Sequence, residues 1–204
     1  SAVALLALAA AVLSIGPPAS ASTSVGPGVI DTNTTWGAAG SPYIVDGQIS
    51  VTADLTIDAG VSVLFNGSFA LTVTGGIHVL GNSSAPVRFA SRDPSSVPSW
   101  TGLRLYDTAN ASEIRNATVD GGSIGLDVVR YAARISLTDI LVTNSSAYGV
   151  RAGGSAFPLS IERLTIHDSR TGVFVYYAQN LSIVNFTAFN LGATNLSWPS
   201  GYTL

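Results

Sequence analysis

One short pattern recurs four times in the C-terminal half of the chain, at intervals of about 23 residues. Each copy is an apolar alternation that a single polar residue interrupts before the alternation resumes. A fixed period of this length is the sequence signature of a stacked solenoid, in which each copy forms one layer. The copies are residues 114–119, 137–142, 161–166 and 183–188.

Alignment of these copies places apolar residues in the same columns, which a solenoid would turn into its core. Each coil would lie about 4.8 Å above the last, so that equivalent residues stack on one another. A third short strand, begun by a glycine, follows the first three copies and completes a three-sided coil. A β-sandwich also uses short strands, but it has no reason to repeat the same corner at a fixed period. The predicted inward columns are Ile114/Leu137/Ile161/Ile183, Ala117/Ile140/Leu164/Phe186 and Val119/Val142/Ile166/Ala188.

The region before the repeats also favours β-structure. Between residues 43 and 106 short alternating segments follow one another, each closed by Gly, Asn or Pro. Residues 22–42 are rich in Ser, Thr, Gly and Pro, which predicts a flexible lead or an N-terminal cap. We therefore expect a solenoid over residues 43–204. We also expect it to continue beyond Leu204, because no polar capping segment follows residue 188.

These features resemble the coils of right-handed parallel β-helix proteins, the pectate-lyase-like superfamily, and particularly its extracellular surface proteins. The resemblance rests on the C-terminal repeats, on the run from Leu55 to Phe65 and on segments 71–77, 86–91 and 100–103. It covers about residues 43 to 197. It implies an all-β, right-handed parallel β-helix solenoid, and it implies little about function, since this fold carries lyases, hydrolases, adhesins and inert shafts alike.

The first 21 residues have the character of a secretory signal peptide. An apolar stretch, residues 3–15, is followed by Gly and Pro and then by Ala19-Ser20-Ala21, a cleavage motif. The alternative is a transmembrane anchor, but about 15 apolar residues are too few to span a bilayer comfortably. The basic start of a signal peptide is missing, so we expect it to be truncated. These observations predict a secreted or cell-surface protein with no membrane span after cleavage.

Composition narrows the possible partners. The formal net charge is −3 and the basic residues number only nine, so the chain lacks the clustered cations that a nucleic-acid groove needs. Without Cys there is no disulfide framework and no thiolate metal site. Neither His78 nor His167 has a second His or a Cys nearby in sequence. The sequence therefore predicts no metal, no cofactor and no nucleic-acid partner.

Nine of the ten asparagines lie in Asn-x-Ser/Thr sequons, whereas a Ser and Thr content of about a fifth would give about two by chance. This pattern predicts a glycosylated protein. The alternative is that β-coil turns simply favour Asn beside Ser and Thr. Asn82 and Asn110 are the better candidates, because Asn144 falls in a corner column where bonding could hide it. The candidates are Asn33, Asn66, Asn82, Asn110, Asn116, Asn144, Asn180, Asn185 and Asn195.

Enzymes on this kind of scaffold bring two or three carboxylates from neighbouring coils to one patch. Here each aligned polar column holds one carboxylate, so we predict no catalytic residues. Asp127 over Arg151 is the most interesting exposed pair, and with Phe174 and Tyr176 it forms the candidate binding site. The plain alternative is an ion pair on a solvated face that contributes little.

The corner set Asn144, Asp168 and Asn190 is interpreted as a structural hydrogen-bonded ladder rather than a Ca²⁺ site, because it carries one charge.

Four aromatic residues near the end of the sequence could form a flat platform for sugar stacking, unless a further coil covers them. They are Phe174, Tyr176, Tyr177 and Phe189.

The sequence as a whole predicts a structural or adhesive β-helix that binds carbohydrate weakly. The alternative is a polysaccharide lyase or glycoside hydrolase whose active coils lie outside residues 1–204. Enzyme activity is left open, with a non-catalytic role favoured. The expected partners are a cell-surface or extracellular polysaccharide and, through an open solenoid end, a second copy of the chain.

Overall fold

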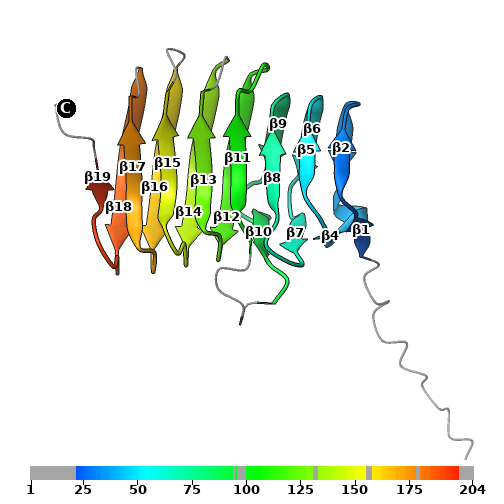
Figure 1. Cartoon of the computed structure of the whole chain (residues 1–204), viewed down its shortest axis with the longest axis horizontal. Helices are drawn as coiled ribbons and strands as arrows, with labels where there is room; N and C mark the ends of the chain where they lie inside the picture. Colours follow the sequence, from blue (N-terminus) through cyan, green and yellow to red (C-terminus); the bar gives the residue numbers. More distant parts are fainter. Residues whose placement is uncertain are drawn as a thin grey trace, which may run out of the picture.

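The computed structural model describes residues 22–93, 95, 100–130, 133–154, 158–177 and 180–197. These residues form a parallel β-solenoid of about seven turns, with about 23 residues in each turn (Figure 1). The predicted β-helix fold and its period are therefore confirmed. The predicted signal peptide, residues 1–21, lies outside the described residues.

Each coil runs through three straight segments, which we call legs 1, 2 and 3 in chain order. Legs 1 and 2 belong to an 11-stranded sheet, called sheet A here, and leg 3 belongs to an 8-stranded sheet, called sheet B. In Figure 1 sheet B faces the viewer as a row of parallel arrows, with sheet A behind it.

The first coils build sheet A from separate short strands. Leg 1 consists of β3 (Thr34–Trp36), β6 (Asp54–Asp58) and β9 (Gly76–Leu80). Leg 2 consists of β1 (Thr23–Val25), β4 (Tyr43–Val45), β7 (Ser62–Phe65) and β10 (Val87–Ser91).

In the later coils one strand of nine residues spans both legs. These strands are β12 (Ser112–Asp120), β14 (Ile135–Thr143), β16 (Leu159–His167) and β18 (Leu181–Phe189). Sheet B contains β2 (Gly28–Ile30), β5 (Ile49–Val51), β8 (Ala70–Val73), β11 (Gly102–Tyr106), β13 (Ile124–Val129), β15 (Tyr148–Gly153), β17 (Thr171–Tyr176) and β19 (Leu196–Ser197).

Single residues in the left-handed region make most corners of the later coils. The first corner, between legs 1 and 2, has φ between 46° and 57° at Asn116, Asp139, Arg163 and Asn185. One residue with positive φ redirects the chain and lets an extended strand resume at once, and Asn and Asp tolerate this conformation best among residues with a Cβ. The second corner uses Asn144, Asp168 and Asn190, and the third uses Asp107, Arg130 and Tyr177.

The core is the stack of inward side chains that the repeats predict. Ile114 pairs with Leu137, Leu137 with Ile161 and Ile161 with Ile183, each one coil further along. The first three are fully buried, whereas Ile183 is only partly buried because β18 is the last described strand of sheet A. The expected end-to-end association of copies through this end stays a prediction.

The ladder begins earlier than the sequence suggested. β1, β2 and β3 pair in parallel with β4, β5 and β6, so residues 22–42 supply strands of the solenoid rather than a flexible lead. These strands have three residues each and are largely exposed on one side. Segments this short do not display enough alternation to be recognised. Helical structure in the described residues is limited to η1 (Ala38–Gly40), and nothing there has the length and apolar character of a membrane-spanning helix.

Candidate functional site

The outward face of sheet B carries three of the four candidate binding residues in one straight column, and Tyr176 lies two residues beyond Phe174 on the same strand. Asp127 pairs with Arg151 on the next strand, and Arg151 pairs with Phe174 on the strand after. On the other side Asp127 pairs with Arg104, which the sequence interpretation did not include. The column therefore places one carboxylate between two guanidinium groups, each one coil away.

Asp127 is a buried carboxylate, not the exposed partner that we expected. Its side chain is only 1% exposed although it points away from the core. Arg151 holds it with two bonds, Nε to Oδ1 at 2.7 Å and Nη2 to Oδ2 at 2.5 Å. Nε of Arg104 lies 3.4 Å from Oδ2 on the opposite side. The expectation of a solvated surface pair is wrong because the two arginine side chains cover the carboxylate from both neighbouring coils.

Because the carboxylate of Asp127 is buried, it depends on its two arginine partners. A buried carboxylate is stable only when cations and hydrogen bonds compensate it, and loss of one partner leaves an unpaired buried charge. The hydrogen bond to Asp127 raises the pKa of Arg151 further above its usual value, so Arg151 remains a cation. Burial also raises the pKa of Tyr176, so its phenol stays neutral at ordinary pH.

Aromatic rings surround the cluster on the same face. The ring centroids of Tyr148 and Phe174 lie 4.9 Å apart, and those of Phe174 and Tyr176 lie 5.9 Å apart, both in stacked arrangements. At the other end the Arg130 guanidinium lies 4.1 Å from the ring centroid of Tyr106. We call this surface the aromatic–arginine face; it consists of Arg104, Tyr106, Asp127, Arg130, Tyr148, Arg151, Phe174 and Tyr176.

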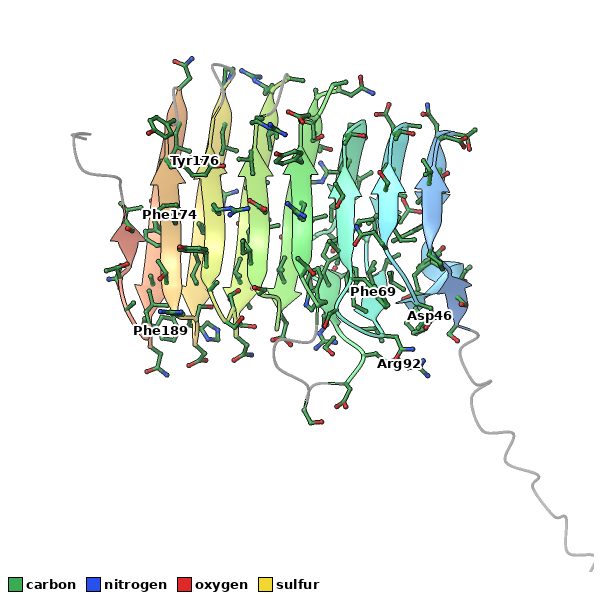
Figure 2. All side chains as sticks on the ribbon, viewed as in Figure 1. Asp46, Phe69, Arg92, Phe174, Tyr176 and Phe189 are labelled. Atoms are coloured by element: carbon green, nitrogen blue, oxygen red, sulfur yellow. The ribbon has the colours of Figure 1, made fainter. Side chains whose placement is uncertain are left out.

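Phe189 does not belong to this face, so the four rings do not form the single platform that was one of the two interpretations of the sequence. It ends leg 2 in sheet A and stacks on His167, with ring centroids 4.8 Å apart. Figure 2 shows Phe174 and Tyr176 along β17 and Phe189 near the lower edge of the solenoid. Tyr177 meets Tyr176 edge to face at 6.3 Å. The sequence grouped these rings by their nearness in the chain, whereas the second corner separates legs 2 and 3.

The predicted ladder of Asn144, Asp168 and Asn190 is present only in part, because one side-chain bond lies within the set and another leads from Asn144 to Asp120, outside it. Nδ2 of Asn190 donates to Oδ1 of Asp168 at 2.7 Å. Nδ2 of Asn144 donates instead to Oδ1 of Asp120, on the preceding coil, at 2.8 Å. His167 Nδ1 lies 2.6 Å from Oδ2 of Asp168, and this contact is the main cause of the lowered pKa of Asp168. The side chains at this corner bond to one another across coils, which is a structural arrangement.

In the part of the chain that the structure describes, no group of three or more His, Cys, Asp or Glu side chains could hold a metal ion. The carboxylate of Asp139 is also engaged, because Arg163 holds it with bonds of 2.5 and 2.9 Å. Polar groups at these corners stabilise the stack of coils.

The sequon asparagines all lie at corners or beside them, three at each corner. Eight are exposed and Asn116 is partly buried. They are Asn82, Asn116 and Asn185 at the first corner, Asn66, Asn144 and Asn195 at the second, and Asn33, Asn110 and Asn180 at the third.

The sequence interpretation missed Arg104, Tyr106, Arg130 and Tyr148 as parts of the face. Two signals could have found Arg104 and Tyr148. Alignment of segment 103–105 with segment 126–128 places Arg104 directly beside Asp127. Tyr148 lies immediately before a strand-opening glycine, a position that the column analysis did not include.

The chain shows no match to a protein-family model, to a curated protein or to a solved structure. The function is therefore inferred from the geometry of the face.

Proposed function

We propose that the protein is a secreted or cell-surface β-helix with a structural or adhesive role, and that its aromatic–arginine face binds carbohydrate weakly and without a metal. The observation that carries this proposal is the buried carboxylate of Asp127 between two arginines, beside a row of aromatic rings on a flat sheet. The apolar N-terminal stretch and its Ala-x-Ala motif support export.

The chemistry of the face suits a sugar chain. Aromatic rings present flat apolar surfaces with a polar tip on tyrosine, and the C–H faces of a sugar ring can pack on them. Arginine and tyrosine supply donors for sugar hydroxyl groups. The surface is an open sheet face rather than an enclosed pocket, so a ligand would keep much of its solvent contact. We therefore expect modest affinity that depends on contacts with several coils.

The alternative, a polysaccharide-cleaving enzyme, has less support at this face. Glycoside hydrolysis requires two carboxyl groups about 5 to 10 Å apart, one as acid and one as base or nucleophile. Asp127 and Asp107, the described carboxylates on or beside the face, are each ion-paired with arginine. Such pairing supports a binding role, in which the acids position arginine side chains.

Affinity measurements with a panel of neutral and acidic polysaccharides would test the proposal. Replacing both Phe174 and Tyr176 by Ala should weaken binding about tenfold, because each stacked ring contributes about 0.5–1.5 kcal/mol. Phe189→Ala is the matched control, since this aromatic residue is 52% exposed and lies outside the face. Unchanged affinity in the double variant would contradict the proposal. Release of reducing or unsaturated sugar ends that Asp127→Ala with Arg151→Ala abolishes would favour the enzyme instead.

A further inference from the structure

The sequons are coupled to the corners in a way that turn geometry does not require. Among the described residues, eleven non-glycine residues have positive φ, and five of them are Asn. Four of these five Asn carry Ser or Thr two residues later, with Asn190 as the exception. Of the six other corner residues, only Arg163 has Ser or Thr at that position. Ser or Thr two residues later is therefore associated with asparagine and not with the left-handed corner itself.

A left-handed corner selects the residue that adopts the conformation and makes no demand on the residue two positions later. Asn33, Asn66, Asn82 and Asn110 do not have positive φ, yet each is also followed by Ser or Thr at the sequon position. The hydroxyl of Ser84 donates to Oδ1 of Asn82 at 2.8 Å and that of Ser112 to the carbonyl oxygen of Asn110 at 3.4 Å, so local bonding accounts for these two hydroxyl residues. The hydroxyls of Thr118 and Thr187 make no described hydrogen bond, and turn chemistry does not explain why these two follow an asparagine at the sequon position.

We propose that the secreted protein is N-glycosylated along its corners, at the asparagines whose side-chain Nδ2 does not bond to a neighbouring coil. These are Asn33, Asn82, Asn185 and Asn195, all exposed and without a described hydrogen bond from Nδ2.

Four of the five other sequon asparagines use the same nitrogen to bond to a neighbouring coil. Nδ2 donates to Asp46 from Asn66, to Asp54 from Asn110 and to Asp120 from Asn144, each at 2.8 Å. Nδ2 of Asn116 reaches the carbonyl oxygen of Gly81 at 3.4 Å, and Asn180 also has an interaction partner.

The chemistry of the modification explains this division. Nδ2 attacks C1 of a lipid-linked oligosaccharide, the bond between C1 and the phosphate oxygen breaks, and the lipid phosphate leaves with the electron pair. Nδ2 loses one proton in the same step and keeps the other. A sugar on Nδ2 replaces one of its two N–H groups and needs space beside the amide. Where Nδ2 bonds to a neighbouring coil, that coil already occupies space beside the amide, whereas the other four asparagines have no such contact.

The outward face of sheet B would stay free of glycan under this arrangement. None of the sequon asparagines belongs to a strand of sheet B, since all of them lie at or beside the corners. Corner glycans would border the aromatic–arginine face without covering it. This inference does not depend on carbohydrate binding by that face.

Site mapping on protein secreted from a host with an N-oligosaccharyltransferase would test the inference. A complete signal peptide of the host, fused before residue 22, directs export in this experiment, and peptide masses before and after enzymatic glycan release report the occupancy of each asparagine. We expect high occupancy at Asn33, Asn82, Asn185 and Asn195 and low occupancy at Asn66, Asn110 and Asn144. An unmodified protein, or equal occupancy of both groups, would overturn the proposal.

A pair of matched variants makes the test independent of folding defects. Thr187 and Thr165 are neighbours in the same outward column, but only Thr187 completes a sequon. Thr187→Ala should remove the glycan at Asn185, Thr187→Ser should keep it, and Thr165→Ala should leave the glycan pattern unchanged. Loss of the Asn185 glycan in Thr165→Ala would show that occupancy follows fold stability and not the sequon, which contradicts the assignment.

Discussion

The two halves of the solenoid build the first corner differently. In β12, β14, β16 and β18, legs 1 and 2 form one continuous strand that bends at a single left-handed residue. In the earlier coils the legs are separate strands, joined by residues 37–42, 59–61 and 81–86. Both kinds of corner deliver the next strand to the same place in sheet A, since β9 and β10 pair with the two ends of β12.

The difference determines what holds each corner. The connection at residues 81–86 has bonds of its own, because Oδ1 of Asn82 accepts bonds from the backbone N–H groups of Ser84 and Ala85 at 3.0 and 2.9 Å. It also bonds to the neighbouring coils, through Gly60 and Asn116. The one-residue corner at Asp139 is held by another coil, through Arg163. The longer early corner therefore adds local bonds to its contacts with the stack, whereas the described side-chain bonds of Asp139 all come from its neighbour in the stack.

Insertion of two residues, Gly-Ser, would separate the two kinds of corner most strongly. After Ser83 the insertion lengthens an exposed loop and separates Asn82 from the two N–H groups that it binds, so we expect a loss of about 1–2 kcal/mol in the free energy of unfolding. After Asp139 the insertion should lower the free energy of unfolding by several kcal/mol. The corners of the two neighbouring coils still contain one residue, so the lengthened corner no longer matches them and backbone groups lose their partners. Each unpaired backbone group costs about 1–3 kcal/mol. Chemical denaturation of both variants measures the difference. Equal losses would refute the distinction between local and stacked corners.

This contrast also explains what the sequence could predict. The repeat was visible where the corner is one residue, because the inward columns of β12, β14, β16 and β18 then align without gaps. The variable connections of the first coils hide the same register, so the sequence predicts a flexible lead or an N-terminal cap where the three-residue strands β1 to β3 lie. A solenoid is predictable from sequence to the extent that its corners have constant length.

The candidate site was predictable only in part, for a related reason. Column alignment placed Asp127, Arg151 and Phe174 in one row, since all three follow strand-opening glycines at the same distance. It did not reveal the burial of Asp127, because that burial depends on Arg104, which lies in a coil of different length. Alignment gives the position of a side chain, whereas its exposure depends on neighbours in the coils on both sides.

Substitution of Arg163 would sharpen the comparison by measuring the strain of a one-residue corner. Its φ of 54° is a left-handed conformation, which costs a residue with a Cβ about 1–2 kcal/mol. Both Arg163→Ala and Arg163→Gly lose the exposed ion pair with Asp139, but only Gly relieves the strain. We expect the Gly variant to be more stable than the Ala variant by about 1 kcal/mol.

The same pair of substitutions at Thr165 is the control for Arg163. This residue lies in regular strand on the same β16, where Gly should be no better than Ala. Thermal or chemical unfolding of the four variants measures both differences. A more stable Ala variant at position 163 would show that this corner carries no strain.

The smallest expected effect is on the pH dependence of stability. It compares two corner carboxylates, Asp46 and Asp139, that have different hydrogen-bond partners. Hydrogen bonds from Ser24 and then Asn66 lower the pKa of Asp46 in the early coils. The hydrogen bond from Arg163 lowers the pKa of Asp139 in the late coils. A lowered pKa in the folded state means that each carboxylate stabilises the protein above its unfolded pKa of about 3.9 and loses that effect as the pH falls through the folded value.

Asp46→Asn and Asp139→Asn should therefore each lower the melting temperature slightly at pH 7, and the deficit should shrink below about pH 4. Salt distinguishes the two. Asp139 faces a cation, so added salt should reduce the effect of its substitution, whereas the main partners of Asp46 are neutral side chains and salt should change its effect less. Melting curves between about pH 3 and pH 7 at low and high salt measure this. Equal salt dependence at both positions would contradict this expectation. It would mean that the charge of Arg163 contributes little to the stability of the late corner and that its hydrogen bonds to Asp139 contribute most.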